Sequence, residues 1–273
     1  MRKNFGKMMQ KIFGVVHSMS KNDVSDHAAS TAFFFFVSLV PMLVALCTIL
    51  PYTPLKERHL IGLAQEIVPV ASKELVIGLI EYVYRKSAGA MSIAILVTLW
   101  TAGKGVLALI RGLNAINQVE ERRNYFVLRL ISSFYTLIML IVLILFLGVM
   151  VFGDQLVQLF FVRMPQLKIM ASLYMEFRFL IVWPVLTALF AIVYAYVPNR
   201  RLRLKEQVPG ACFSAVAWSV FSWFFSLYVS ISGVYSIYGS LSIIVILMIW
   251  MYVGMYILFI GASINHELAK KDV

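Results

Sequence analysis

The chain has 273 residues, of which 61% are hydrophobic and only 14% are charged, and its mean hydropathy is +0.86. Soluble domains are roughly half apolar and about a quarter charged, so this composition excludes an ordinary soluble protein. The formal charge of +11 suits either nucleic acid or a membrane surface, and the positions of the basic residues decide between these two.

Six apolar runs are each long enough to cross a bilayer core, which takes about 20 helical residues. They cover residues 28–50, 88–112, 125–153, 177–197, 210–232 and 241–265. Pro41 inside the first run predicts a kink that neighbouring helices accommodate. We therefore expect an all-α, polytopic membrane helix bundle. Its parts are a basic leader over residues 1–27, a six-helix domain over 28–265 and a short tail over 266–273.

Two connectors are too long to be simple turns. In residues 60–84 the apolar positions Leu75, Leu79 and Val83 recur with helical spacing on one face, and Pro69 interrupts the segment. This pattern predicts short amphipathic helices on the extracytoplasmic side, lying at the membrane surface. Residues 154–176 form a second connector of the same kind.

Basic residues are distributed unevenly between alternate segments. Fifteen Lys and Arg residues lie in the leader, the second loop, the fourth loop and the tail, whereas eight lie in the other segments. The positive-inside rule then places both chain ends in the cytoplasm. The same distribution predicts a basic rim that faces anionic inner-leaflet lipid, and it makes nucleic acid unnecessary as a partner.

Lys104 lies well inside the second apolar run, where charged side chains are rare and normally face a cavity or a partner. If the run ends at Gly112, Lys104 lies about 12 Å from that end at 1.5 Å per residue. Two interpretations are equally open at this depth. The long stem can reach the interface, or the ammonium group can face a functional cavity. Gly103 and Gly105 favour close helix packing or access to the ammonium group.

Other polar residues lie near the predicted inner ends of the helices. Together with Lys104, the candidate substrate-binding residues are Asp26, Arg111, Asn114, Asn265 and Glu267. Each alone is more often an interfacial residue, but together they predict an inward-facing polar vestibule, since helix ends with unpaired backbone groups also converge there.

The histidines, the cysteines and a row of serines do not indicate a functional site. The four histidines form no local metal-ligand pair, so we expect no metal and no cofactor. Cys47 and Cys212 lie in apolar runs and are interpreted as packing residues. A stripe of serines at helical spacing favours a close helix interface over a polar path. It consists of Ser219, Ser222, Ser226 and Ser230.

Short motifs along nearly the whole chain resemble the YihY/BrkB family of bacterial inner-membrane proteins, formerly labelled ribonuclease BN-like. The motifs are Ala32-Phe33-Phe34, Ser38-Leu39-Val40-Pro41, Trp100, Leu113-Asn114, Glu121-Arg122, Pro198, Pro209-Gly210-Ala211, Tyr238-Gly239-Ser240-Leu241, Trp250 and Gly261-Ala262-Ser263-Ile264-Asn265. Within them, Pro41, Tyr238, Gly239 and Gly261 are the expected structural positions. Ser263 stands where the family pattern usually has Glu. The resemblance implies a six-helix inner-membrane protein, with family-level links to serum resistance and envelope lipid handling.

Two functions from different classes fit these features. The first is a transporter or flippase-like protein for an amphiphile or an anionic solute, because an intramembrane cation and a basic inner mouth suit a negative group. The second is a non-transporting scaffold or envelope-assembly factor, with self-association of the chain left open. A nuclease needs a cluster of acids, bases or metal ligands, and the sequence offers none, so we expect no enzyme.

Overall fold

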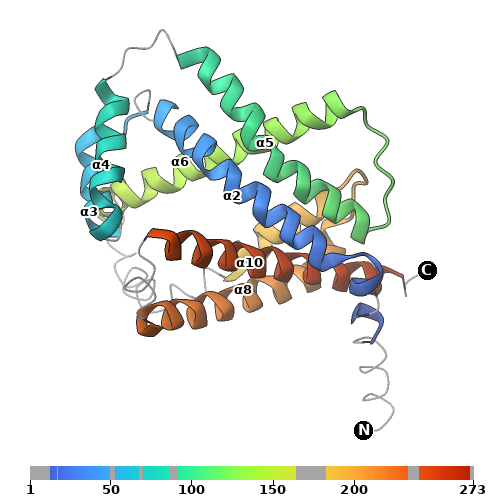
Figure 1. Cartoon of the computed structure of the whole chain (residues 1–273). Coiled ribbons are helices and arrows are strands. Elements are labelled where there is room, and N and C mark those ends of the chain that lie inside the picture. The colour runs from blue at the N-terminus through green and yellow to red at the C-terminus, as the bar shows by residue number, and fades with distance from the viewer. Residues whose placement is uncertain are drawn as a thin grey trace. The chain divides into compact units, whose positions relative to one another are not determined.

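The structure is a computed structural model that describes residues 13–16, 18–49, 53–67, 70–85, 91–163, 183–232 and 240–270. Throughout these ranges the regular structure is helical and includes no strand (Figure 1). The helices are α2 (Val24–Ile49), α3 (Glu57–Ile67), α4 (Val70–Arg85), α5 (Met91–Ile116), α6 (Tyr125–Arg163), α8 (Leu204–Ser232) and α10 (Ser240–Ala269), with a shorter helix at Trp183–Tyr196. The all-α prediction is confirmed.

Three of these helices are long and apolar enough to cross a membrane, over Tyr125–Val142, Leu204–Val229 and Ile244–Ala269. The described part of a further apolar helix is Trp183–Tyr196, and residues 164–182 before it lie outside the described residues. Helices α2 and α5 are each 26 residues long, which matches the length of a spanning helix. The chain is therefore a membrane protein with several apolar helices, while the count of six spans stays a prediction.

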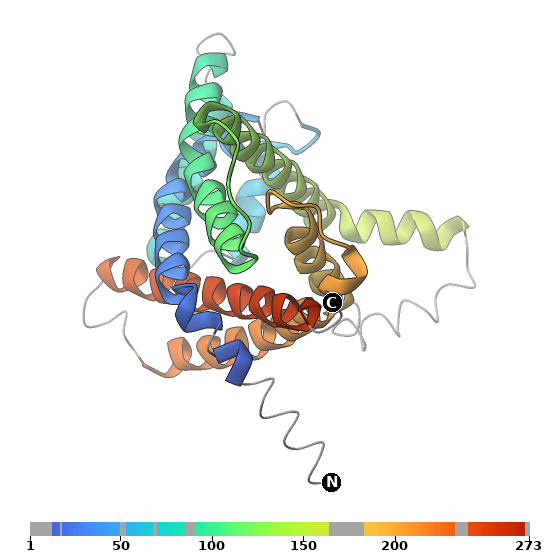
Figure 2. The same cartoon turned by 90° about the vertical axis from the view of Figure 1, so that its right-hand side faces the viewer.

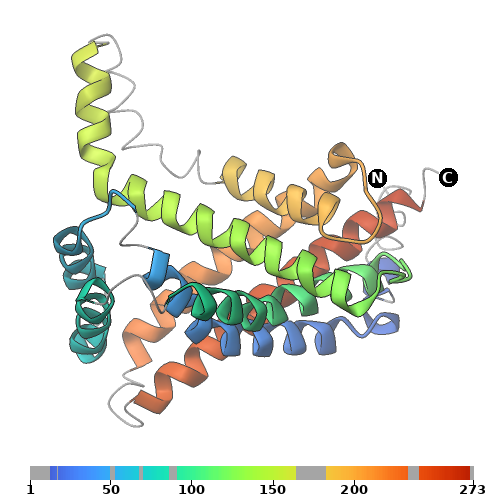
Figure 3. The same ribbon diagram turned by 90° about the horizontal axis from the view of Figure 1, so that it is seen from above.

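Helix α6 is longer than the sequence predicted. It has 39 residues, or about 58 Å of helix, and this is roughly twice the thickness of a bilayer core. The predicted span ended at residue 153, but the helix continues to Arg163 into the predicted connector. Figure 3 shows that α6 changes direction along its length. The rest of that connector, residues 164–176, lies outside the described residues.

The chain divides into two compact units. Unit 1 comprises residues 1–36, 107–124 and 177–273, and unit 2 comprises residues 37–106 and 125–176. Helices α2 and α5 each contribute to both units, because the boundaries fall inside them.

In unit 2, α3 and α4 pack against each other (Figure 3). The predicted break at Pro69 falls between the end of α3 and the start of α4 and lies outside the described residues. Helix α3 is amphipathic, with Leu60 buried and Arg58 exposed. Leu55 and Leu60 form a small core with Leu140 of α6, and the Tyr84 hydroxyl donates a hydrogen bond to the Leu55 carbonyl at 2.8 Å. The two predicted connector helices are therefore packed parts of unit 2.

In unit 1, α8 and α10 lie side by side (Figures 1 and 2). Three glycines bring the two helices close together. A Cβ at Gly261 would lie 2.7 Å from the Gly210 carbonyl oxygen, and a Cβ at Gly254 would lie 2.6 Å from the Trp218 ring. In lipid, helices associate through such close packing and through hydrogen bonds, because the surrounding acyl chains are as apolar as the side chains.

Buried hydrogen bonds also hold α8 and α10 together where they cross. The Asn265 side chain accepts a bond from the Gly210 amide at 2.7 Å and donates one to the Gln207 carbonyl at 3.0 Å. Pro209 lies between these two residues and lacks an N–H group, so the helical hydrogen-bond ladder is disturbed there. Further along, the Tyr194 hydroxyl donates to the Leu258 carbonyl at 2.7 Å. Three helices of unit 1 are thus joined through buried polar groups.

The Gly261→Ala substitution tests this packing. An added methyl group would meet the Gly210 carbonyl oxygen, so we expect the free energy of unfolding to fall by about 1–3 kcal/mol, the usual cost of overpacking. The measurement is thermal unfolding of the purified chain in detergent.

The matched control is Gly62→Ala in α3, where a Cβ would meet no atom within 4 Å. That substitution is expected to be neutral or to stabilise the protein by about 0.4–1 kcal/mol. Equal melting temperatures for the two variants would contradict a tight crossing at Gly261.

Candidate functional site: a basic pocket at one end of unit 1

Four segments that are far apart in sequence meet at one end of unit 1. The Asn199 amide, which precedes α8, donates to Asn114 of α5 at 2.8 Å. A Cβ at Gly112 would lie 3.3 Å from the Cβ of His27, and a Cβ at Gly14 would lie 3.2 Å from Glu267 Oε2. These contacts bring together the leader, the second loop, the fourth loop and the end of α10. The charge distribution had assigned the same four segments to one side of the membrane.

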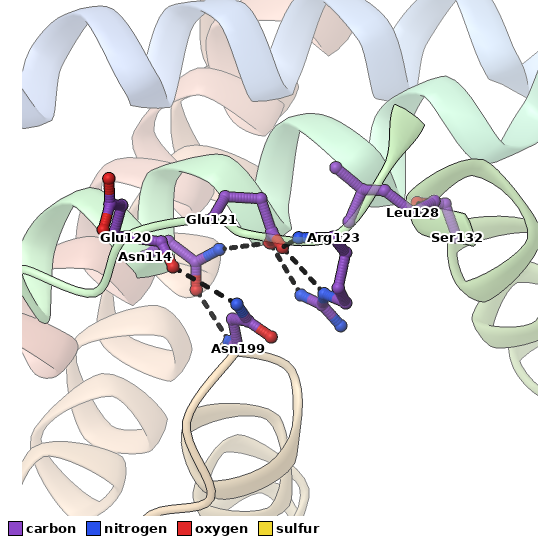
Figure 4. A network of polar contacts seen from close by, with 7 residues as sticks. All are labelled: Asn114, Glu120, Glu121, Arg123, Leu128, Ser132 and Asn199. Carbon is purple, nitrogen blue, oxygen red and sulfur yellow. Dashed lines mark hydrogen bonds and ion pairs between the residues drawn. The ribbon is translucent and has the colours of Figure 1, made fainter. Parts of the chain in front are cut away.

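Asn114 organises the loop that follows α5 (Figure 4). Its side chain is buried, and its amide nitrogen donates to Glu121 at 2.8 Å. Its side-chain oxygen accepts the bond from the Asn199 backbone, and the Asn199 side chain donates to the Glu120 carbonyl at 3.2 Å. Both ends of the Asn114 amide group are therefore engaged by the protein itself.

The carboxylate of Glu121 completes this network. Arg123 donates two side-chain hydrogen bonds to it, at 2.8 and 2.7 Å, as Figure 4 shows. These bonds lower the pKa of Glu121 below its ordinary value, against an opposing effect of partial burial, and the Asn114 amide lowers it further. Asn114 and Glu121, which belong to two of the family-like motifs, are thus joined with Arg123 in a network that holds one loop in place.

A pocket of about 590 Å³ opens at the same end of unit 1. Its walls come from the segment after α5, from the start of α8 with the loop before it, and from the end of α10. The polar residues that line it are Asn117, Arg200, Arg203, Glu206, Gln207, Asn265, His266 and Lys270. We call this cavity the basic pocket.

Positive charge predominates in the basic pocket. Arg203 forms a 3.4 Å ion pair with Glu206, and Lys270 forms a 2.9 Å ion pair with Glu267. Arg200 is exposed and forms no ion pair with any residue of the described ranges. Exposed pairs of this kind contribute little free energy, so a ligand can compete for the cations. The pocket therefore offers guanidinium and ammonium donors, together with amides, to a negatively charged group.

The predicted vestibule residues are only partly brought together. Asn265 lines the basic pocket, although its side chain is engaged in the α8–α10 crossing, and Glu267 pairs with Lys270 beside it. Asp26 is exposed in the first turn of α2. Arg111 is exposed and makes no ion pair within the described part of the chain. Substrate binding by these residues stays a prediction.

Lys104 belongs to unit 2 and is exposed. Because α5 runs to Ile116, Lys104 lies about 18 Å from the helix end, which is deeper than the 12 Å expected from the apolar run. Gly103 beside it is buried, and a Cβ there would lie 3.3 Å from the Ser133 backbone nitrogen of α6. Gly103 therefore serves helix packing, and a cavity at the Lys104 ammonium group stays a prediction.

The expected structural positions have separate outcomes. Pro41 lies inside α2, as predicted, and Gly261 lies at the crossing of α8 and α10. Tyr238 and Gly239 lie outside the described residues. Ser263 is fully buried, and its hydroxyl donates to the Phe259 carbonyl at 2.9 Å. Where the family pattern usually has an acid, this chain therefore has a small side chain whose hydroxyl is hydrogen-bonded within its own helix.

Sequence reasoning overlooked two sets of residues. Arg200 and Arg203 were used only to assign topology, although a run of cations at a helix start was the available signal. Arg129 was counted with the second loop, but it is buried in α6, where it donates to the Trp100 carbonyl and lies 5.1 Å from the centre of the Trp100 ring. A basic residue one turn inside an apolar helix is the signal for such a pair.

The interface predicted for the serine stripe stays a prediction. Ser222 and Ser226 line a cavity of about 450 Å³ beside Trp250 of α10, and the Ser219 hydroxyl donates within its own helix at 2.8 Å. Cys212 is exposed, so its interpretation as a packing residue is wrong. Within the described ranges, no three His, Cys, Asp or Glu side chains are placed to hold a metal ion.

Comparison with known proteins identifies the family. The model of the virulence factor BrkB family matches residues 15–273. The chain belongs to this family. A ribonuclease-like protein of Bacillus subtilis, YfkH, is 32% identical over 246 residues, which cover 89% of this chain and 90% of that protein. A UPF0761 membrane protein of Vibrio parahaemolyticus is 27% identical over 265 residues, covering 93% of this chain and 80% of that protein. No solved structure matches this BrkB-family chain.

The Glu121→Gln substitution tests the loop network. The folded-state pKa of Glu121 is depressed, so its ionised form contributes stability above the ordinary value of 4.5, and this contribution is lost as pH falls through the folded value. We expect the melting temperature of the wild type to fall more steeply below pH 4.5 than that of Glu121→Gln.

Glu120→Gln is the matched control, because the Glu120 carboxylate is largely exposed and pairs only with exposed Arg122. Its acid dependence should follow the wild type. An identical pH profile for Glu121→Gln and the wild type would contradict a stabilising role for the Glu121 carboxylate.

Proposed function

We propose that this BrkB-family protein moves an amphiphile or an anionic solute across the membrane, and that the negative group of the substrate binds in the basic pocket. The observation that carries the proposal is the pocket itself, which combines Arg200, Arg203 and Lys270 with neutral amide groups. A volume of about 590 Å³ is in the range of small-molecule sites and accommodates a phosphate-bearing headgroup or a small organic anion.

The balance of charge supports an anion over a cation. Glu206 is the one acid among the lining residues, and it is already paired with Arg203. The three cations Arg200, Arg203 and Lys270 therefore outnumber the acid at the pocket.

We also propose that the basic pocket faces the cytoplasm of a bacterial inner membrane, with both chain ends on that side. The bias of basic residues toward the leader, the second and fourth loops and the tail supports this orientation. The contacts that gather these segments at one end of unit 1 support their assignment to a common side. The proposal assigns no catalytic chemistry to the chain.

Cysteine labelling tests the orientation. In a chain carrying Cys47→Ala and Cys212→Ala, Gly62→Cys in α3 should react with an impermeant maleimide added outside intact cells, because α3 belongs to the predicted outer connector. Lys270→Cys in the tail should react only after the cells are lysed. Labelling of the Lys270 variant from outside would overturn the orientation.

Transport in vesicles tests the function. The full chain is reconstituted in vesicles of phosphatidylethanolamine and phosphatidylglycerol, and two probes are followed: fluorescent phosphatidylglycerol crossing the bilayer, and uptake of inorganic phosphate. We expect wild type to move one of them, which separates a lipid headgroup from a free anion. Arg200→Gln should lower that rate about fivefold at limiting probe, the effect of one cation near an anionic group.

Arg201→Gln is the matched control, because Arg201 is an exposed neighbour of the same charge that does not line the pocket. Its transport rate should equal that of the wild type. Equal losses for Arg200→Gln and Arg201→Gln would argue against the basic pocket as the binding site. Failure of the wild type to move either probe would favour the non-transporting scaffold.

A further inference from the structure

A second cavity in unit 1 has a different chemical character. It measures about 660 Å³ and runs between the helix Trp183–Tyr196 and α8, where apolar side chains make up nearly all of its lining. Its lining residues on α8 are Leu204, Val208, Cys212 and Val216. These positions recur at helical spacing along one face of α8, so the cavity is an elongated groove. We call it the hairpin groove.

The hairpin groove and the basic pocket lie on different faces of α8. On α8, Glu206 and Gln207 line the pocket, whereas residues 204, 208, 212 and 216 line the groove. The helical repeat of 3.6 residues separates these two sets around the helix axis. The groove is therefore a separate site and does not rest on the proposed transport function.

The dimensions of the groove match one leaflet of a bilayer. From Leu204 to Val216 the helix rises about 18 Å at 1.5 Å per residue. One leaflet accounts for half of a hydrocarbon core of about 30 Å. An acyl chain that lies along the groove would therefore span about one leaflet, with the last few ångströms of the groove at the headgroup level.

One end of the groove carries a cation. Lys205 is exposed and precedes Val208, Cys212 and Val216 on the same helical stripe, at spacings of three, four and four residues. Across the hairpin, Tyr196 is exposed and lies one turn beyond Ile192, another lining residue. Tyr and Lys at the end of an apolar helix are typical of the headgroup level. The apolar length and the terminal cation together match the chemistry of an anionic lipid.

We propose that the hairpin groove holds one acyl chain of an anionic phospholipid, whose phosphate lies beside Lys205. The acyl chain covers the exposed apolar wall of α8, and the ammonium group of Lys205 attracts the headgroup. Trp183 lies at the other end of the groove, toward which the chain terminus points.

Native mass spectrometry of the full chain tests the proposal. The protein is purified in detergent with equal amounts of phosphatidylglycerol and phosphatidylcholine, and the retained lipids are counted. The wild type should retain more phosphatidylglycerol than phosphatidylcholine. Lys205→Gln should lower that preference about fivefold, the effect of one cation at an anionic headgroup. Ala188→Phe should abolish retention of both lipids, because Ala188 is exposed and lines the groove.

Two variants serve as matched controls. Lys21→Gln and Arg201→Gln each remove an exposed cation that lines neither the hairpin groove nor the basic pocket, so both should retain lipid as the wild type does. Melting temperatures establish that each variant is folded. Equal retention of the two lipids by the wild type, or no retained lipid at all, would overturn the proposal.

The exposed thiol of Cys212 gives a second measurement that does not depend on a groove-filling variant. In a Cys47→Ala chain, phosphatidylglycerol should slow maleimide modification of Cys212 several-fold, because the acyl chain covers the thiol. Soluble glycerol phosphate should leave the rate unchanged. Protection by glycerol phosphate alone, or no protection by the lipid, would contradict an acyl chain in the groove.

Discussion

The crossing of α8 and α10 is the interaction on which unit 1 depends. Lipid supplies no hydrophobic driving force between helices, so close backbone approach and hydrogen bonds must hold them together. Gly210 and Gly261 permit the approach, and Asn265 supplies the hydrogen bonds around Pro209. Because the Asn265 amide is buried between the helices, any shift that breaks its bonds would leave a polar group unsatisfied in an apolar surrounding.

The same crossing arranges the two proposed sites. It turns the Gln207 face of α8 toward the end of α10, where both contribute to the basic pocket. The opposite stripe of α8 is left beside the helix Trp183–Tyr196, where the hairpin groove forms. A single helix therefore separates a polar cavity from an apolar one, which is the chemical division within an amphiphile.

A buried charge in an apolar helix is costly unless other groups stabilise it, as they do at Arg129. In unit 2 its guanidinium group lies against the Trp100 ring and donates to the Trp100 carbonyl, so the charge is partly stabilised without an acid. In unit 1 the cations instead lie at the helix ends, where Glu121 and Arg123 hold the loop around Asn114. The contact of Arg129 with Trp100 links α6 to α5. The pairing of Glu121 with Arg123 leaves the cations of the basic pocket available to ligands.

The sequence by itself determined the class of the protein. Apolar runs, the Pro69 break and the family motifs sufficed for an all-α membrane protein with helices close to those observed, because lipid imposes long apolar segments and internal backbone hydrogen bonding. The tertiary structure alone decided that Gly210 meets Gly261 and that Arg200 lines a pocket with Asn265. Those contacts join residues more than 50 positions apart, and periodicity along one helix carries no information about which face of another helix it will meet.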